Sequence, residues 1–354
     1  MTHSCACHTV QPTGLPSFLS LVIHPSSQLH RRFELMLHAH GIPAQTDEQT
    51  LTVDAGDVPQ LRAVLAGLPE GDRASIRAVP FTSQGPQMWE LRPLHTWVER
   101  LSSDWFEQAT RNLVFHGQPI VRMDNGQVLG YEALVRARVE GQLIGAGALL
   151  EAAAAHEQLR AFDALARITA ITQLYGRLAP AQLLFINFAP GVIYNPDICL
   201  RTTFQACREV KADFSRLVFE ITEGEAFPDL RLLRSIMERY RSEGARIALD
   251  DLGAGHTSLS YLAELRPDIV KLDRALIQGL HASAPAARLV RSLTDYAHDL
   301  GIQVVAEGIE QPEDLEAVRA AGVDFAQGYY LGRPAEVLAP VSAGAREHWK
   351  AIPA

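Results

Sequence analysis

Two adjacent aspartates, Asp250 and Asp251, end a short apolar run in the stretch IALDDLGAGH. The run is typical of a buried strand, and an unpaired carboxylate loses a large hydration free energy when it leaves water. The pair therefore needs either a solvated turn or a cation. Adjacent aspartates at a strand end can serve two divalent ions about 3.5 to 4 Å apart, one carboxylate bridging both ions and its neighbour binding one of them.

Polar residues also lie at the ends of other apolar runs. They are Glu132 in YEAL, Asn187 in FINFAP, Glu220 and Glu223 in FEITE, Lys271 in VKLD, Glu307 in VAEG and Gln327 in AQGYY. A single acid at such a place is more often a helix cap or a turn former. Several carboxylates that converge without a counter-charge would repel one another by roughly 4 kcal/mol per pair at 4 Å. Divalent cations remove that repulsion, and ligation by carboxylate and amide oxygens favours Mg²⁺ or Mn²⁺ over zinc.

Lysine is rare in this chain, which makes Lys271 informative. Lysine occurs at positions 211, 271 and 350, so 29 of the 32 basic residues are arginine. A compact ammonium inside an apolar run can hold or polarise a water molecule, and a bulky guanidinium would not replace it easily. The alternative is a buried salt bridge between Lys271 and one of the acids.

Alternating strand and helix patterns fill the chain from about residue 110 onward. Short apolar runs at 113 to 121, 128 to 135, 182 to 188, 216 to 222, 246 to 250, 268 to 273, 302 to 308 and 323 to 328 predict strands. Most are separated by helical periodicity, at 157 to 177, 229 to 243, 286 to 300 and 311 to 321. This α/β pattern favours a (β/α)8 barrel, in which the polar strand ends meet at the carboxyl-terminal face. The Asp124-Asn125-Gly126 turn predicts that the first two strands are antiparallel.

The first 112 residues show a different pattern. We expect residues 1 to 14 to be disordered, residues 15 to 90 to form a small N-terminal α+β domain, and residues 91 to 112 to form a linking helix before the barrel at 113 to 340. His3, Cys5, Cys7 and His8 could bind a metal, but their spacing favours a frayed terminus. By analogy with how such barrels are usually attached to input domains, we expect the small domain to be a regulatory or dimerisation module. On the linking helix, Trp97, Leu101, Trp105 and Phe106 predict a face that packs either on the barrel or on a second copy.

Composition excludes some classes of protein. The 354 residues carry a net charge of −9, which argues against binding of duplex nucleic acid by broad phosphate neutralisation. No stretch approaches eighteen uninterrupted apolar residues, and the first residues lack a basic start and an apolar core. We therefore expect no membrane span and a cytoplasmic location.

The motifs resemble those of the EAL-domain family of cyclic di-GMP phosphodiesterases. The resemblance covers residues 110 to 337 and rests, in order, on QPI, GYEALVR, INFAP, FEITE, ALDDLGAGHTSLSYL, DIVKLDRALI, VVAEGIE and FAQGYYLGRP. It implies a TIM-like barrel with an antiparallel first strand, a homodimer, and hydrolysis of cyclic di-GMP to linear pGpG with two Mg²⁺ or Mn²⁺ ions.

The resemblance also implies residue roles. The ligands of one metal would be Glu132, Asn187, Glu220 and Asp250; Asp250 and Asp251 would hold the second, with Glu307 completing the cluster. Lys271 and Gln327 would orient the attacking water, Gln118, Leu134 and Arg136 would contact the substrate, and Glu223 would brace the loop after the paired aspartates.

That loop departs from the family pattern. The family commonly has DDFGTGYSSL, whereas this chain has DDLGAGHTSL, with Leu252, Ala254, His256 and Thr257 at the changed positions. Ala189 also stands where serine is common. Because every implied ligand and Lys271 is present, the sequence favours an active enzyme whose turnover the loop could reduce. The alternative is a catalytically inactive receptor that binds cyclic di-GMP and signals through its N-terminal domain or dimer.

Overall fold

The computed structural model describes residues 9–11, 14–22, 28–46, 50–221, 229–253 and 259–350, in two compact units. The barrel unit contains Asn112–Ala146 and the chain from Arg160 onward, and the N-terminal unit contains Val10–Arg111 and Gly147–Leu159. The sequence cluster His3, Cys5, Cys7 and His8 lies outside the described residues.

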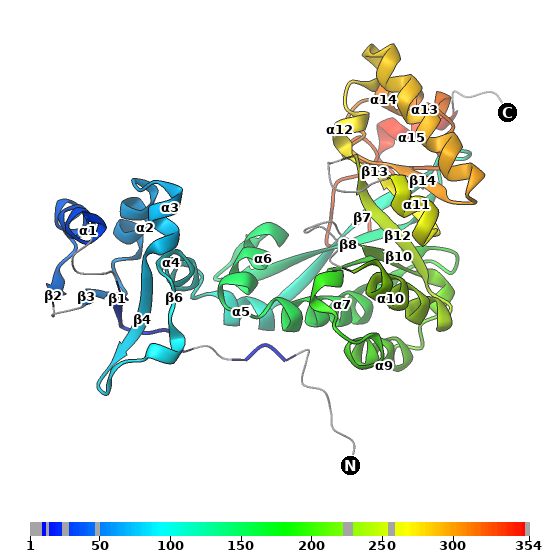
Figure 1. Cartoon of the computed structure of the whole chain (residues 1–354). Coiled ribbons are helices and arrows are strands. Elements are labelled where there is room, and N and C mark those ends of the chain that lie inside the picture. The colour runs from blue at the N-terminus through cyan, green and yellow to red at the C-terminus, as the bar shows by residue number, and fades with distance from the viewer. Residues whose placement is uncertain are drawn as a thin grey trace. The chain divides into compact units, whose positions relative to one another are not determined.

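The N-terminal unit is a small α+β domain, as the sequence predicts. Its strands are β1 (Phe18–Val22), β2 (Ala44–Thr46), β3 (Thr50–Asp54), β4 (Arg77–Thr82), β5 (Gly85–Pro86) and β6 (Arg92–Pro93). They form an antiparallel sheet of order β2-β3-β1-β4-β5, with β6 also paired to β4. The helices are α1 (Gln28–Ala39), α2 (Val58–Ala66) and α3 (Glu70–Ser75), and a 3-10 turn covers Met88–Glu90 (Figure 1). Phe33 and Leu37 of α1 pack with Leu19 and Leu21 of β1 in the core.

The predicted linking helix is two short helices, α4 (Leu94–Ser102) and α5 (Phe106–Arg111). The break follows Ser103, whose hydroxyl donates to the carbonyl oxygens of Glu99 (2.7 Å) and Arg100 (3.2 Å) and competes with the helical hydrogen bonds. Trp97, which the sequence assigned to a face that packs on the barrel or on a second copy, has its side chain almost fully buried. It is buried in the core of the N-terminal unit, where its indole Nε1 donates to the Ala78 carbonyl at 3.0 Å.

The barrel unit confirms the predicted TIM-like barrel. Its strands are β7 (Leu113–Arg122), β8 (Val128–Val139), β9 (Gln142–Ile144), β10 (Leu183–Phe188), β11 (Leu217–Ile221), β12 (Arg246–Leu252), β13 (Ile269–Leu272), β14 (Gln303–Ala306) and β15 (Phe325–Gln327). The sheet runs β10-β11-β12-β13-β14-β15-β7-β8, a parallel β8–β10 pairing closes it, and β9 extends β8. β7 is antiparallel to both β15 and β8, so the first strand has the predicted direction.

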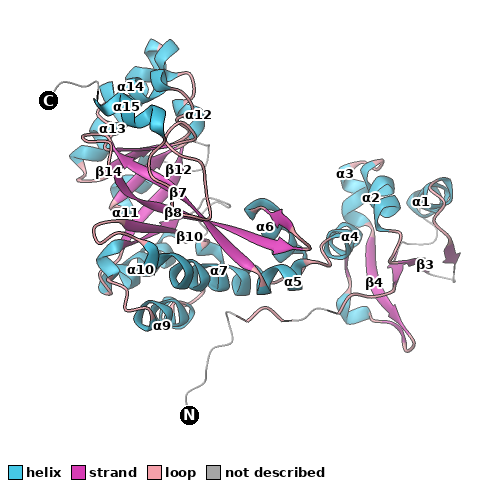
Figure 2. Cartoon of the chain, turned by 180° about the vertical axis from the view of Figure 1, so that it is seen from behind, coloured by secondary structure: helices cyan, strands magenta, loops and turns pink. Residues whose placement is uncertain are grey.

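Helices surround these strands, which Figure 2 shows in magenta. They are α7 (Leu159–Leu174), α8 (Pro196–Cys199), α9 (Arg201–Glu209), α10 (Leu230–Ser242), α11 (Leu259–Leu265), α12 (Arg274–Ile277), α13 (Ala284–Asp299), α14 (Pro312–Ala320) and α15 (Ala343–Lys350). The helix α6 (Ala146–Ala155) belongs mostly to the N-terminal unit. Short 3-10 turns cover Tyr175–Arg177, Pro190–Val192, Phe214–Arg216 and Leu280–Ala282. Within the described ranges, no helix has the length and apolar character that crossing a membrane requires.

Side chains fill the barrel interior, so it is a packed core and not a pore. One buried layer consists of Ile120, Leu129, Leu183, Phe185, Val218, Ala248, Ile269, Val305 and Phe325, which come from eight different strands. This layer closes the interior beneath the carboxyl ends of the parallel strands, and polar side chains at those ends can face only one another or the cavity above.

Candidate metal centre

Lys271 lies at the middle of the polar strand ends. It is the third residue of β13, and its side chain is 1% exposed. Its Nζ lies 2.6 Å from Glu307 Oε1, 3.1 Å from Glu220 Oε1, 3.3 Å from Asp250 Oδ1 and 3.6 Å from Glu132 Oε2. Both sequence interpretations of Lys271 predicted its nearness to acids. One ammonium therefore faces four carboxylates from β8, β11, β12 and the end of β14.

Two amides fix the Glu132 carboxylate. Asn187 at the end of β10 donates from Nδ2 to Glu132 Oε1 at 2.8 Å, and Gln327 at the end of β15 donates from Nε2 to Oε2 at 2.7 Å. Burial favours the neutral acid, but Lys271 and these two hydrogen bonds outweigh it and lower the pKa of Glu132. Glu132 is therefore an ionised ligand candidate with a fixed orientation.

The paired aspartates occupy an irregular end of β12. Asp251 has a positive φ of 55°, and the ladder between β12 and β13 shifts register between Leu249 and Leu252. The Asp251 amide donates to Asp250 Oδ1 at 3.0 Å. The following Gly253 has φ 111°, and a Cβ there would lie 2.4 Å from Leu276 Cδ1, so the chain needs glycine at this turn.

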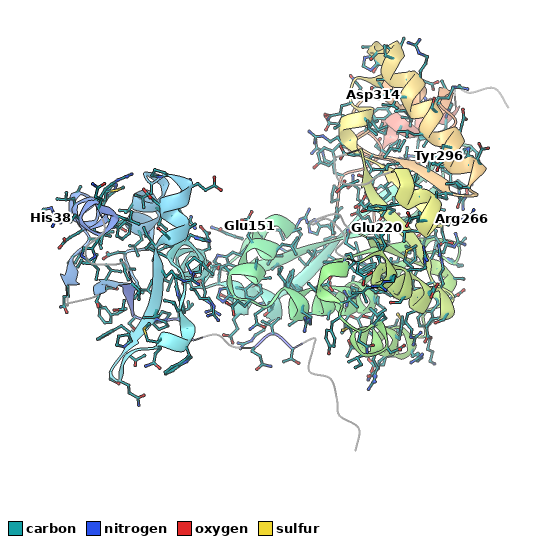
Figure 3. All side chains as sticks on the ribbon, in the orientation of Figure 1. His38, Glu151, Glu220, Arg266, Tyr296 and Asp314 are labelled. Atoms are coloured by element: carbon teal, nitrogen blue, oxygen red, sulfur yellow. The ribbon has the colours of Figure 1, made fainter. Side chains whose placement is uncertain are left out.

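Both aspartates lie near Glu307. Carboxylate oxygens of Asp250, Asp251 and Glu307 all lie within 4.8 Å of one another, a spacing that one divalent cation could bridge. We call Glu132, Glu220, Asp250, Asp251 and Glu307, together with Lys271, the acidic centre. Figure 3 labels Glu220 among the strands of the barrel unit.

The acidic centre holds more negative charge than one lysine neutralises. Burial raises the pKa of Glu220 well above its ordinary value, and burial together with the Asp250 charge raises the pKa of Asp251 to about 6. Burial also raises the pKa of Asp250 and, against the opposing effect of Lys271, that of Glu307 to about 8. For Lys271, burial disfavours the charge, but the surrounding acids outweigh it and raise its pKa well above the ordinary value. Further protons or cations must balance the remaining charge.

The residues present fit a divalent cation. Among the described residues, three buried oxygens at these strand ends have no hydrogen-bond partner: Asn187 Oδ1, Glu220 Oε2 and Gln327 Oε1. Glu220 Oε1 also makes no hydrogen bond of good geometry, although it lies 3.1 Å from Lys271 Nζ. Buried polar atoms are normally satisfied, so oxygens of this kind favour a hard metal ion with its waters.

A cavity of about 240 Å³ opens above the acidic centre. Its lining includes the expected Gln118, Glu132, Asp250, Lys271, Glu307 and Gln327. It also includes Arg274, Glu310 and Tyr329, which the sequence reasoning did not select. Each of the three lies inside one of the quoted motifs, two or three residues after Lys271, Glu307 or Gln327. The signal that could have found them is therefore their position just after a polar strand end.

Of the other predicted residues, Asn187, Glu220 and Asp251 lie at the strand ends but do not line this cavity. Three more lie outside the cavity lining or outside the described residues. Leu134 and Arg136 lie on β8, partly buried, outside the cavity lining, and Arg136 Nη1 donates to the Val135 carbonyl at 2.7 Å. Glu223 lies outside the described residues, as do the altered loop residues Ala254, His256 and Thr257. Leu252, the other altered residue, is buried at the end of β12.

The fold is an eight-stranded α/β barrel with an antiparallel first strand. Carboxylates cluster at the carboxyl ends of its parallel strands, where barrels of this class have their active sites. The EAL domain family model matches residues 103–334, so this chain belongs to the EAL domain family.

Curated relatives and solved structures agree with this family assignment. The chain is 31% identical over 231 residues to the "Probable cyclic di-GMP phosphodiesterase PdeB" of Escherichia coli K12, a match that covers 63% of this chain and 43% of that protein. A standalone EAL protein of Vibrio cholerae O395, solved with c-di-GMP bound, is 32% identical, covers 66% of this chain and 97% of its own, and has a TM-score of 0.59. The chain spans less than half the length of the curated relatives it matches.

One further structure bears on the fold of both units. A Klebsiella pneumoniae BlrP1 structure aligns with 92% of this chain and 97% of its own, with a TM-score of 0.60 and 20% identity. The share of this chain that it covers extends well beyond the 66% covered by the Vibrio cholerae protein. At this identity the likeness concerns the fold alone.

Proposed function

We propose that this chain hydrolyses cyclic di-GMP to linear pGpG with the help of two divalent ions, Mg²⁺ or Mn²⁺. The observation that carries the proposal is the convergence of Lys271 with four carboxylates beneath an open cavity, in a chain similar to named cyclic di-GMP phosphodiesterases. Hydrolysis forms one P–O bond to the oxygen of water and breaks one P–O3′ bond, which gives a linear dinucleotide.

The two ions would be shared among the residues of the acidic centre. Glu132, Asn187, Glu220 and Asp250 would hold one ion, and Asp250 and Asp251 the second, with Glu307 completing the set. The partnerless oxygens of Asn187 and Glu220 support this assignment, as does the spacing of Asp250, Asp251 and Glu307. When bound, such ions supply Lewis acidity and lower the pKa of a bound water.

Lys271 and Gln327 would orient the attacking water. Because the pKa of Lys271 is raised well above its ordinary value, its ammonium donates hydrogen bonds and does not accept a proton. Gln327 donates its amide to Glu132, and its Oε1 has no partner within the described residues, so that oxygen can accept a hydrogen bond from water. The proton of the water must pass to a carboxylate or to solvent.

The substrate would contact the cavity lining and the neighbouring strand β8. Gln118 lines the cavity and donates from Nε2 to the Gly332 carbonyl at 3.3 Å. Leu134 and Arg136 are proposed contacts on the resemblance alone, and contact with the substrate would require Arg136 to leave its bond to Val135. Glu223 is proposed, on the same basis, to brace the loop that follows Asp251.

We also propose a homodimer in the cytoplasm, where guanine nucleotides are found, with residues 15 to 90 as a regulatory or dimerisation domain, residues 91 to 112 as the link, and residues 113 to 340 as the catalytic barrel. The matched region covers less than half of each of three curated relatives, so those relatives contain further segments outside the match. Size-exclusion chromatography with light scattering, on the full chain, tests the dimer.

The test of activity is direct. Purified protein is incubated with cyclic di-GMP and Mn²⁺ or Mg²⁺, and pGpG is measured by chromatography. Lys271→Ala and Glu132→Ala should abolish pGpG formation, whereas Lys211→Ala, at an exposed lysine after α9, should not. If no pGpG forms while the protein still binds cyclic di-GMP, the inactive receptor replaces the enzyme.

A further inference from the structure

A buried ion pair on α7 lies close to the acidic centre without lining the cavity. Arg167 Nη1 bonds to Asp163 Oδ2, and the two side chains are 2% and 10% exposed. Arg167 Nε also donates to Thr203 Oγ1 on α9 at 3.3 Å. A buried ion pair loses hydration on both partners and is often no more stable than apolar residues of the same volume, so its presence favours a role beyond stability.

The second oxygen of Asp163 holds the backbone at the end of β10. Asp163 Oδ1 accepts a hydrogen bond from the Ala189 amide at 3.0 Å. The ladder of β10 with its neighbours ends at Phe188, so this amide lies beyond the sheet. Asp163 therefore fixes the chain two residues after Asn187, whose Oδ1 is buried in the acidic centre without a partner among the described residues.

Two other carboxylates make the same kind of bond at the opposite end of the barrel. Asp268 Oδ2 accepts from the Ile247 amide at 2.9 Å and pairs with Arg241, near the start of β12. Asp324 Oδ2 accepts from the Val304 amide at 2.8 Å, near the start of β14. These two lie at amino ends of strands, away from the acidic centre. Asp163 makes its bond at a carboxyl end, beside a proposed ligand.

We propose that Asp163, held by Arg167 and Thr203, is a positioning residue that fixes Asn187 for binding of a divalent ion. This inference rests on the proposed function and adds a residue of the second layer to it. The charge of Asp163 strengthens its bond to the Ala189 amide, and the bond restricts rotation of the backbone that carries Asn187. Without the hydrogen bond from the Ala189 amide to Asp163, only a fraction of the molecules would keep the bond between Asn187 and Glu132. Binding of the ion would then have to order this strand end, which would weaken its affinity.

The test compares Asp163→Asn with Asp268→Asn. Both variants replace an arginine-paired carboxylate that accepts from a strand-end amide, and both keep an acceptor oxygen. Mn²⁺ is titrated into metal-free protein by calorimetry, and the Mn²⁺ dependence of pGpG formation is measured in parallel. We expect Asp163→Asn to weaken Mn²⁺ binding about 10-fold, the usual effect of losing a partner behind a metal ligand, while Asp268→Asn binds as the wild type does.

The result separates positioning from loss of fold. The KM for cyclic di-GMP at saturating Mn²⁺ should stay unchanged in Asp163→Asn, because the residue lies outside the cavity lining. Thr203→Val, which removes only the acceptor of Arg167, should weaken Mn²⁺ binding in the same direction by about two- to threefold, and it serves if Asp163→Asn does not fold. Wild-type Mn²⁺ affinity in these variants, or an equal loss in Asp268→Asn, would overturn the inference. A wild-type protein that binds no Mn²⁺ would instead refute the proposed function.

Discussion

Replacing Lys271 by methionine should distinguish the role of the lysine, which would orient water, from the role of the carboxylates, which would bind metal. Methionine keeps most of the volume and removes the charge that faces four carboxylates. At 3.3 Å, the Nζ–Asp250 distance, one opposite-charge contact is worth about 5 kcal/mol at an effective dielectric near 20, before the loss of hydration is counted. Removing one partner of a buried pair usually costs roughly 3 to 5 kcal/mol in measured stability.

The metal-free Lys271→Met protein should therefore unfold about 10 °C below the wild type at pH 8. At pH 6 the difference should be smaller, because carboxyl groups with raised pKa values bind protons and lose their mutual repulsion. Saturating Mn²⁺ should reduce the difference further, since the ions replace the missing positive charge. Turnover should nevertheless be absent, because no ammonium is left to orient water.

Thermal unfolding followed by circular dichroism at both pH values, with and without Mn²⁺, measures these shifts. Lys211→Met, at an exposed lysine, is the control for the substitution itself. An unchanged midpoint for metal-free Lys271→Met at pH 8 would show that the carboxylates do not depend on Lys271. Loss of Mn²⁺ binding in this variant would show that Lys271 positions the ligands, which contradicts its assignment to the water.

Three further predictions concern pH and packing. Burial raises the pKa of Glu307 to about 8, so the folded state holds this proton more tightly than the unfolded state does. The stability of the metal-free protein, measured by denaturant titration, should therefore fall as pH rises from 5 to 9, and it should fall less in Glu307→Gln. A rise in stability over this pH range would contradict the prediction. His156 stacks on Phe106 in the N-terminal unit, and burial lowers the pKa of His156. The N-terminal unit should therefore lose stability as pH falls below about 6.5. Hydrogen exchange measures this loss, which should be absent in His156→Gln. Gly328→Ala would place a Cβ 2.2 Å from the Ile309 backbone and should cost more than about 3 kcal/mol in urea unfolding, whereas Gly147→Ala, with nothing within 4 Å, should cost nothing.

The sequence predicted the barrel well because its signals are local and repeated. The run RIALD predicted a strand at 246 to 250, and β12 continues only to Leu252. The hairpin at Asn125-Gly126 predicted the antiparallel first strand. The carboxyl ends of the seven parallel strands then had to meet, so the convergence of Lys271 with its carboxylates followed from the topology.

The remaining features depend on tertiary contacts that periodicity does not encode. The face of Trp97 was visible in the sequence, but nothing there showed that it would pack against Ala78 of its own unit. The strand β2 (Ala44–Thr46) was too short to give a pattern. Asp163 and Arg167, four residues apart on a helix, look like an exposed surface pair, and only the fold places them against Ala189.

The central claim is that the acidic centre hydrolyses a cyclic dinucleotide with divalent ions. Its most direct test is the rate of pGpG formation from cyclic di-GMP by the purified full chain, with Mn²⁺ and then with excess chelator. We predict pGpG formation that requires the metal, stops with chelator, returns when Mn²⁺ is restored, and is absent in Glu132→Ala. A metal-loaded protein that binds cyclic di-GMP and leaves it intact would contradict this account.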